Sequence, residues 1–168
     1  NDGLYEEIQS LTPMDYQQAT REELIQAMMD AGIVGMGGAG FPTYIKYKYA
    51  KDIHTVVING VECEPYITAD YRMIENYMDD LMVGTLAMIK MANAKKAIIT
   101  VKKTKGALIK KLQEAAQAYP TIEITPVPDV YPMGWERTLV YQLFTKRYDK
   151  LPSELGLIVN NATTAIVF

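Results

Sequence analysis

The chain has 168 residues, of which 49% are hydrophobic and 22% charged, the ordinary composition of one globular domain with a genuine core. A net charge of −3 and a pI near 5.2 argue against a nucleic-acid-binding protein, which normally needs a basic face. The single cysteine excludes an internal disulfide and an iron–sulfur cluster held by four thiolates of this chain.

The first segment, residues 1–19, shows no clear period, and we expect it to be an N-terminal extension. Its first twelve residues lack the basic start and apolar run of a secretory signal. The most apolar long stretch, 81–94, is interrupted by Lys90 and is too short to span a bilayer. We therefore expect a cytoplasmic protein. Because the sequence ends on the apolar residues 165–168, we also expect it to be part of a longer chain.

A glycine-rich segment follows the first predicted helix, which Thr20 and Glu23 open as a capping box. It reads Gly35-Met-Gly37-Gly38-Ala-Gly40-Phe41-Pro-Thr43, with Lys46 three residues later. Such a backbone allows close approach by a ligand, and its successive N–H groups can bind an anion beside the lysine. The segment predicts a site for a phosphate-bearing cofactor. A tight connection whose glycines serve only turns is the alternative.

The spacing Gly35-x-Gly37-x-x-Gly40 matches the dinucleotide-binding fingerprint, but its context does not. That fingerprint follows a strand and opens a long helix. Here a helix precedes the glycines, and Pro42 is tolerated only in the first turn of a helix, so at most a short helix covers 43–49. The context excludes the dinucleotide fingerprint and leaves a glycine-rich loop of another kind.

The rest of the chain alternates strands with helices. Strands are expected over 54–59, 96–101, 121–127 and 155–159. Helices are expected over 70–92, over 104–118 with Thr104 as its cap, over 136–147, and after Asn160 and Asn161. Alternation of this kind requires crossover connections, so the sequence predicts a Rossmann-like α/β fold with a mainly parallel sheet and helices on both faces.

Three polar clusters come directly after predicted strands, at 59–64, 129–136 and 160–164. In an open parallel sheet the ligand crevice lies beyond the carboxyl ends of the strands, so we expect the three clusters and the glycine-rich segment to meet there. The carboxylates of Glu62 and Glu64 suit a ribose, a ring amide or an amine, or form a solvated acidic loop. Tyr131 and Trp135 either stack on a planar ring or pack against the protein.

Together these motifs resemble a known family. In order and spacing, the glycine-rich segment, Asn59-Gly-Val-Glu62-Cys-Glu64-Pro and Val-Asn160-Asn161-x-x-Thr164 are similar to the NADH-oxidising flavoprotein subunit of respiratory complex I. The stretches 62–70 and 151–160 resemble its RnfC-type relatives more closely, including the RnfC-like electron-transfer proteins that serve clostridial amino-acid reductases in anaerobic metabolism. The resemblance runs from about Thr20 to the last residue.

The resemblance implies an FMN- and NADH-binding α/β domain over 20–168, with FMN bound non-covalently. It assigns NADH contacts to Phe41 and Glu64. It assigns FMN contacts to a larger set: Gly35, Gly37, Gly38, Gly40, Lys46, Asn59, Glu62, Tyr131, Gly134, Glu136, Asn160, Asn161 and Thr164. Iron–sulfur clusters are then expected in further domains or partner subunits, and the whole protein is expected at the cytoplasmic face of a membrane complex.

The implied function is an electron-transfer flavoprotein module that passes a hydride between nicotinamide and flavin and electrons on to iron–sulfur centres. Three departures from the family pattern favour an alternative. Met36 stands where complex I usually has Arg, and Val61 and Trp135 stand where it has acids. The alternative is a non-catalytic domain that serves as a docking or scaffold part of an electron-transfer complex.

Overall fold

The computed structural model describes residues 13–168, so the first twelve residues of the predicted extension lie outside the described part. The fold is a parallel sheet of four strands in the order β3-β2-β1-β4. The strands are β1 (Thr55–Asn59), β2 (Lys96–Lys102), β3 (Ile122–Val127) and β4 (Leu157–Asn161). The predicted fold class is thus confirmed.

The two central strands explain why the sheet forms where it does. β1 is a run of β-branched residues, four of them buried, and β2 has five consecutive buried residues, as expected for strands covered on both faces. Val57 pairs with Ile98 of β2 on one side and with Val159 of β4 on the other. β3 is an edge strand, which accommodates Pro126 because one side of that strand needs no ladder hydrogen bonds.

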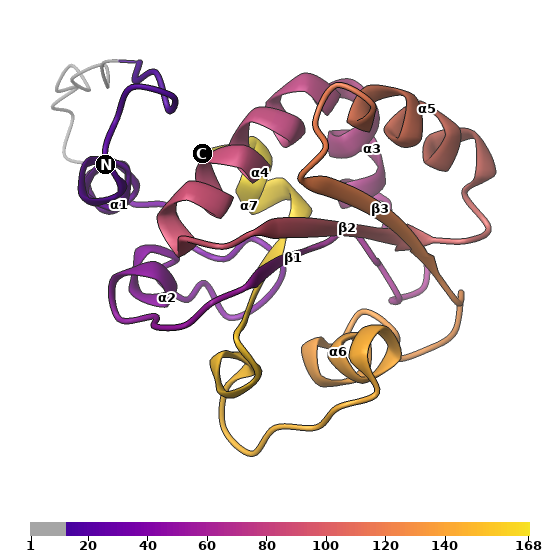
Figure 1. The fold of residues 1–168 in the computed structure, drawn as a ribbon. Helices are drawn as coiled ribbons and strands as arrows, with labels where there is room; N and C mark the ends of the chain where they lie inside the picture. The colour runs from indigo at the N-terminus through magenta and orange to yellow at the C-terminus, as the bar shows by residue number, and fades with distance from the viewer. Residues whose placement is uncertain (1–12) are drawn as a thin grey trace, which may run out of the picture.

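Helices cover both faces of the sheet (Figure 1). One face carries α3 (Ala69–Asn76), α4 (Met78–Ala92), α5 (Gly106–Ala116) and α7 (Ala162–Ile166). The other face carries α6 (Glu136–Phe144), and a 3-10 turn (Pro152–Leu155) leads into β4. The larger core lies under the first group and includes Met88 and Ile58, and the smaller one joins Leu139 of α6 to Val159.

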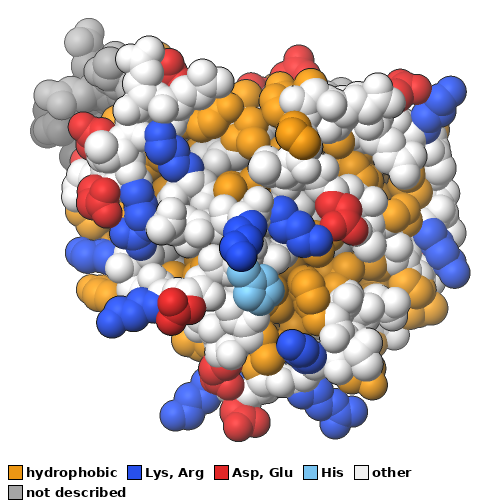
Figure 2. Space-filling view, in the orientation of Figure 1, with side chains coloured by type: hydrophobic (Ala, Val, Ile, Leu, Met, Phe, Trp, Pro, Cys, Tyr) orange, Lys and Arg blue, Asp and Glu red, His pale blue; other side chains and the backbone are white. Residues whose placement is uncertain are grey.

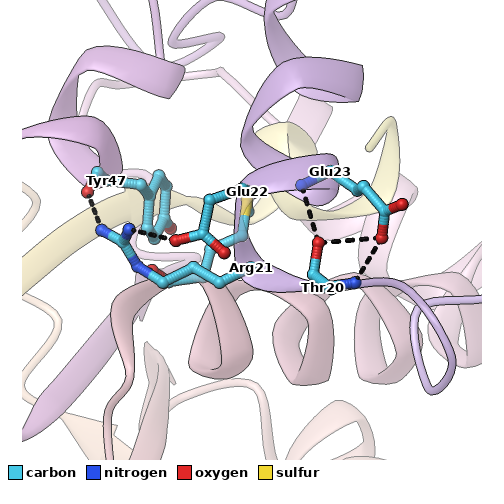
Figure 3. A network of polar contacts seen from close by, with 6 residues as sticks. Thr20, Arg21, Glu22, Glu23 and Tyr47 are labelled. Carbon is cyan, nitrogen blue, oxygen red and sulfur yellow. Dashed lines mark hydrogen bonds and ion pairs between the residues drawn. The ribbon is translucent and has the colours of Figure 1, made fainter.

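The N-terminal helices contribute side chains to the larger core. In α1 (Arg21–Asp30), Glu23 N–H donates to Thr20 Oγ1 at 3.2 Å and Thr20 N–H donates to Glu23 Oε2 at 2.7 Å, which is the predicted capping box (Figure 3). Arg21 donates to the Tyr47 carbonyl of α2 (Tyr44–Lys48) at 2.6 Å. This contact fixes the short helix that follows the glycine-rich segment.

The predicted helix over 70–92 is wrong in one respect, because two helices occupy it. Tyr77 has φ −127° and ψ 46°, so α3 ends there and α4 begins at Met78. Asp79 and Asp80 in the first turn of α4 favour a helix start at this point, since acidic side chains complement the helix dipole. The break lets α3 pack beside α7 while α4 crosses the sheet.

The predicted cap of α5 is also wrong. Lys105 precedes the helix, and the Thr104 hydroxyl donates instead to Asp129 Oδ2 at 2.7 Å. Asp129 also pairs with Lys102 at 3.0 Å, and hydrogen bonds from Thr104 and Lys102 hold the pKa of its carboxyl below the ordinary value. Asp129 therefore ties the end of β2 to the chain after β3. Other boundaries differ slightly: α6 ends at Phe144, and β4 extends through Asn161.

Charged side chains of both signs are interspersed on the face seen in Figure 2, with the single histidine, His54, among them. His54 lies directly before β1, and its Nδ1 is 2.9 Å from Thr55 Oγ1.

Among the helices of residues 13–168, none is long and apolar enough to cross a membrane.

Candidate functional site

A cleft of about 760 Å³ lies at the carboxyl ends of β1 and β4. The glycine-rich segment and all three polar clusters contribute to it, as the topology predicts. Twelve of the predicted site residues line it: Gly35, Gly37, Gly38, Phe41, Lys46, Asn59, Glu62, Glu64, Gly134, Glu136, Asn160 and Asn161. Met36, Val61, Ile67, Asp70, Trp135 and Arg137 are among the other lining residues.

Residues 35–41 form one part of the lining, which we call the Gly loop. Its base is closed by Gly35 N–H, which donates to the Phe41 carbonyl at 2.9 Å, and by an isolated antiparallel bridge between Val34 and Pro42. Met36 N–H donates to Thr164 Oγ1 at 2.9 Å. Among the described residues, the N–H groups of 37–39 have no hydrogen-bond partner. All three residues line the cleft.

The glycines of the loop serve different purposes. A Cβ at Gly37 would lie 2.8 Å from Asn161 Nδ2, so this position needs glycine for a close approach within the protein. Gly40 has φ +65°, a left-handed conformation that favours glycine. Gly38 is required neither by a close approach nor by a left-handed backbone, since a Cβ there would meet nothing within 4 Å and its φ is not positive. Gly38 lines the cleft, so its lack of a side chain leaves room there.

Residues 59–64 and 131–136, which we call the polar loops, form another part of the lining. Asn59 Nδ2 donates to the Gly134 carbonyl at 2.9 Å, and its Oδ1 accepts from Val61 N–H at 3.0 Å. A Cβ at Gly134 would lie 2.3 Å from the Val61 carbonyl oxygen. The two loops are therefore packed backbone against backbone, and glycine at 134 allows it.

The two glutamates after β1 differ in their surroundings. Glu62 caps α3, because its carboxylate accepts from Asp70 N–H at 2.7 Å and from Tyr71 N–H at 3.1 Å. Glu64 is exposed, and its carboxylate has no hydrogen-bond partner among the described residues. Of the two carboxylates, that of Glu64 is the one available to a ligand.

Lys46 and Glu136 are oppositely charged, half-buried residues that both line the cleft. Lys46 Nζ donates to the Val159 carbonyl at 2.6 Å, and burial lowers the pKa of its ammonium despite the nearby Glu136 charge. Glu136 Oε1 accepts from Tyr148 Oη at 2.8 Å. Burial, together with that hydrogen bond to Glu136, raises the pKa of Tyr148, so the phenol keeps its proton and its role as donor.

The asparagines at the end of β4 have different hydrogen-bond partners. Asn160 is buried, and its amide donates to the hydroxyl of Tyr47 and lies 3.6 Å from Met88 Sδ, under the larger core. Asn161 faces the Gly loop and caps α7 by accepting from Thr164 N–H at 3.2 Å. Thr164 is fully buried beneath the loop.

Three predicted site residues do not line the cleft: Thr164, Gly40 and Tyr131. Gly40 belongs to the loop but does not line the cleft, and Tyr131 packs edge-on against Trp135 with 6.3 Å between ring centroids. Sequence reasoning missed Asp70, which lines the cleft, and Tyr148, which holds Glu136. Asp70 ends the stretch 62–70, so only its position in that motif could have singled it out.

Comparison with known proteins decides the family. The family model described as the Nuo51 FMN-binding domain matches residues 28–167. The chain belongs to this family. It contains a domain of the type that binds FMN in complex I flavoproteins, which confirms the resemblance found in the sequence. The Gly loop with its unpartnered N–H groups, the open position at Gly38 and the nearby Lys46 fit a phosphate-bearing flavin.

The relatives belong to multi-subunit enzymes. The chain is 36% identical over 154 residues to a subunit of the ion-translocating oxidoreductase complex of Serratia proteamaculans, covering 90% of this chain and 22% of that protein. It is 31% identical over 170 positions to a subunit of the proton-translocating ferredoxin:NAD(+) oxidoreductase complex of Clostridium ljungdahlii, covering 98% and 37%. The chain therefore spans less than two fifths of either relative.

A solved structure matches the fold. The NAD+-reducing [NiFe]-hydrogenase in its air-oxidized state superposes with a TM-score of 0.77 and 29% sequence identity, over 88% of this chain and 29% of that one. The fold of this chain is thus shared with part of a chain of that hydrogenase.

Proposed function

We propose that this chain is the FMN- and NAD(H)-binding module of an electron-transfer oxidoreductase subunit. The observation that carries the proposal is the cleft at the carboxyl edge of the sheet, where the Gly loop presents unpartnered N–H groups beside Lys46 and the exposed carboxylate of Glu64. The family match and the names of the relatives, which include a ferredoxin:NAD(+) oxidoreductase, support it.

The residues of the cleft have distinct parts in this proposal. The N–H groups of the Gly loop bind the flavin phosphate, which they suit because backbone donors in a concave loop favour anions. Lys46 places its charge beside the flavin, and Glu64 and the exposed ring of Phe41 meet the nicotinamide nucleotide. When bound, FMN would accept a hydride and pass its two electrons on one at a time.

Polar side chains of the polar loops shape the cleft. Asn59, Glu62 and Glu136 each hold a hydrogen bond within the protein, so they fix the walls against which the two planar rings would lie. The iron–sulfur centres that take the electrons belong to other domains or subunits, since this chain has one cysteine. We expect contact with those subunits to hold the module at the cytoplasmic face of a membrane complex.

The test is a titration of the purified chain with FMN, followed by NADH without oxygen. We expect bound FMN with shifted flavin absorbance that bleaches on addition of NADH. Riboflavin, which lacks the phosphate, serves as the matched control and should bind at least about tenfold more weakly, a difference of about 1.4 kcal/mol. A colourless chain that takes up no FMN would contradict the proposal.

A second candidate is a non-catalytic docking domain. Its supporting observation is that Met36, Val61 and Trp135, which replace charged residues of the complex I pattern, all line the cleft. The same titration separates the two candidates. Normal uptake of FMN without bleaching by NADH would favour the docking domain.

A further inference from the structure

Asp70 lies in the first turn of α3 and lines the cleft, but both of its carboxylate oxygens face the protein. Oδ2 accepts from Asn161 Nδ2 at 2.6 Å, and Oδ1 accepts from Thr163 Oγ1 at 2.6 Å. Hydrogen bonds to an ionised carboxylate are about twice as strong as neutral ones. One side chain of α3 thus holds two positions of the junction between β4 and α7.

Asn161 carries this constraint to the Gly loop. Its amide donates to Asp70 and its Oδ1 accepts from Thr164 N–H at 3.2 Å, so both ends of the amide are engaged. The same side chain occupies the space next to Gly37, where an added Cβ would lie 2.9 Å from Asn161 Cβ. The position of Asn161 therefore limits where the Gly loop can lie.

The orientation of the Asn161 amide depends on Asp70. An amide has a donor side and an acceptor side, and a carboxylate can only accept. With Asp70 ionised, the NH₂ group turns to α3 and the carbonyl oxygen is left for Thr164 N–H. The reversed amide would set its oxygen against the carboxylate and remove the cap of α7. Thr164 would then be less firmly placed to accept from Met36 N–H, now at 2.9 Å.

Asp70 itself is fixed from the other side. Its N–H donates to Glu62 Oε1 at 2.7 Å, which joins the start of α3 to the loop after β1. A continuous set of hydrogen bonds therefore runs from the loop after β1, through α3 and the end of β4, to the Gly loop.

We propose that Asp70 is a positioning residue, which sets the anion-binding conformation of the Gly loop through Asn161 without touching the ligand. The inference rests on the proposed function in that FMN is taken as the ligand. The Asp70–Asn161 hydrogen bond determines the order of the Gly loop in the ligand-free chain, and this can be measured without FMN.

The test is an exchange of the two side chains. Asn161→Asp alone sets two carboxylates against each other. Asp70→Asn alone replaces the ionised acceptor by an amide, whose oxygen can still accept from Asn161 Nδ2 while its NH₂ group turns to the Thr163 hydroxyl, so it removes the charge that strengthens both hydrogen bonds. The double variant Asp70→Asn/Asn161→Asp restores a donor and an acceptor, keeps an acceptor for Thr163 and for Thr164 N–H, and leaves the net charge unchanged. The matched control is Asp79→Asn, the same substitution at an exposed residue of the first turn of α4.

Two readouts are measured on the full chain: hydrogen exchange of the Met36 amide in ligand-free protein, by NMR, and the FMN dissociation constant. We expect Asn161→Asp to accelerate Met36 exchange and to weaken FMN binding by about tenfold, the equivalent of about 1.4 kcal/mol. Asp70→Asn, which keeps a weaker neutral hydrogen bond, should act in the same direction with a smaller effect. The double variant should recover most of the slow exchange, and the Asp79 control should match the wild type.

The inference would be overturned if the effects of the two single substitutions on Met36 exchange simply added in the double variant. It would also be overturned if the single variants left Met36 exchange unchanged. If the single variants do not fold, Thr163→Val tests it, because that change removes only one of the two hydrogen bonds to Asp70. It should accelerate Met36 exchange about threefold, in line with a net hydrogen-bond energy of about 1 kcal/mol or less, and an unchanged rate would again overturn the inference. A wild-type chain that binds no FMN contradicts the proposed function alone, because the exchange measurement stands without it.

Discussion

The Gly loop and the polar loops line the same cleft but are held in place by different groups. The Gly loop is attached through its own backbone: Gly35 N–H and Met36 N–H donate to Phe41 and Thr164, and the N–H groups of 37–39 have no partner within residues 13–168. Its surface is exposed. Most of what this loop offers to a ligand is main chain.

The polar loops are attached through side chains. Asn59 holds the Gly134 carbonyl, Glu62 caps α3, and Glu136 accepts from Tyr148. Asn and Glu side chains can bind ligands, and the sequence therefore predicts ligand contacts for them, yet Asn59, Glu62 and Glu136 each have a partner in the protein. They form a rigid wall, and Glu64 is left as the exposed acid among them.

Because of this difference, we expect the Gly loop and the polar loops to respond differently to substitution. Changes in the polar loops remove contacts that hold the fold together, so they should reduce stability and binding together. Changes at the tip of the Gly loop meet open space, so they should reduce binding alone. The charged side chains of the cleft are unequal in number: four are acidic and two, Lys46 and Arg137, are basic. Arg137 already donates to the carbonyls of Tyr148 and Asp149.

The largest effect is expected at Gly134. In Gly134→Ala the new methyl group would lie 2.3 Å from the Val61 carbonyl oxygen and 3.0 Å from Cys63 Sγ, and the first of these is backbone that cannot move aside cheaply. We expect the free energy of unfolding to fall by about 3 kcal/mol, the upper part of the usual range for overpacking. Urea denaturation monitored by circular dichroism measures it.

Gly106→Ala is the matched control, because an added Cβ at the start of α5 meets nothing within 4 Å. It should leave stability unchanged or raise it by up to about 1 kcal/mol through the smaller entropy of the unfolded chain. If Gly134→Ala were as stable as this control, the polar loops would not be packed as tightly as their backbone contact indicates.

The fold was largely predictable because its signals are local. A run of β-branched residues located β1, short apolar runs located the other three strands, and Thr20 with Glu23 located the start of α1. The break at Tyr77 was not predictable from periodicity, because the apolar pattern continues across it and the change of direction follows from packing of α3 against α7. Thr104 failed as a cap because Asp129, 25 residues away, competes for its hydroxyl.

A smaller effect, confined to binding, is expected at Gly38. Gly38→Ala places a methyl group in open space at a position with no left-handed backbone, so stability should stay within about 0.5 kcal/mol of the wild type. If the flavin phosphate lies against the loop, the methyl group displaces it, and FMN affinity should fall about tenfold, or about 1.4 kcal/mol. Fluorescence titration measures the affinity and thermal unfolding the stability.

Equal FMN affinity in Gly38→Ala and Gly106→Ala would contradict this prediction and move the phosphate away from the loop. A loss of stability in Gly38→Ala would instead mean that the loop tip, like the polar loops, is packed against the protein.

The location of the site was predictable, but the orientation of its side chains was not. Parallel strands bring their carboxyl ends to one edge, so the clusters after β1 and β4 had to meet there. Asn160 and Asn161 both line the cleft, but the amide of Asn160 donates to Tyr47 in the core, whereas Asn161 lies against Gly37 and donates to Asp70. Adjacent residues of one motif therefore have different partners, and a motif cannot distinguish them.

The smallest effect concerns Lys46, which lies between the two regions, and it appears as a dependence on pH. Burial lowers the pKa of this ammonium from its ordinary value of 10.5. Below the folded-state pKa both states carry the proton, and the buried charge costs stability. As the pH rises between the folded and unfolded pKa values, the folded chain has released a proton that the unfolded chain still binds, so the free energy of unfolding rises.

Lys46→Met removes this dependence. We expect the wild type to gain stability relative to the variant as the pH approaches 10.5 from below, in urea denaturation at a series of pH values. The comparison isolates Lys46 because other titrating groups are common to both proteins. Lys48→Met, at an exposed residue of the same helix, controls for the loss of a charge and should show no such relative gain. A constant difference for Lys46→Met across that range would mean that its ammonium is as well solvated as that of Lys48, and the cleft would then lack the buried cation that sets it apart from the surface.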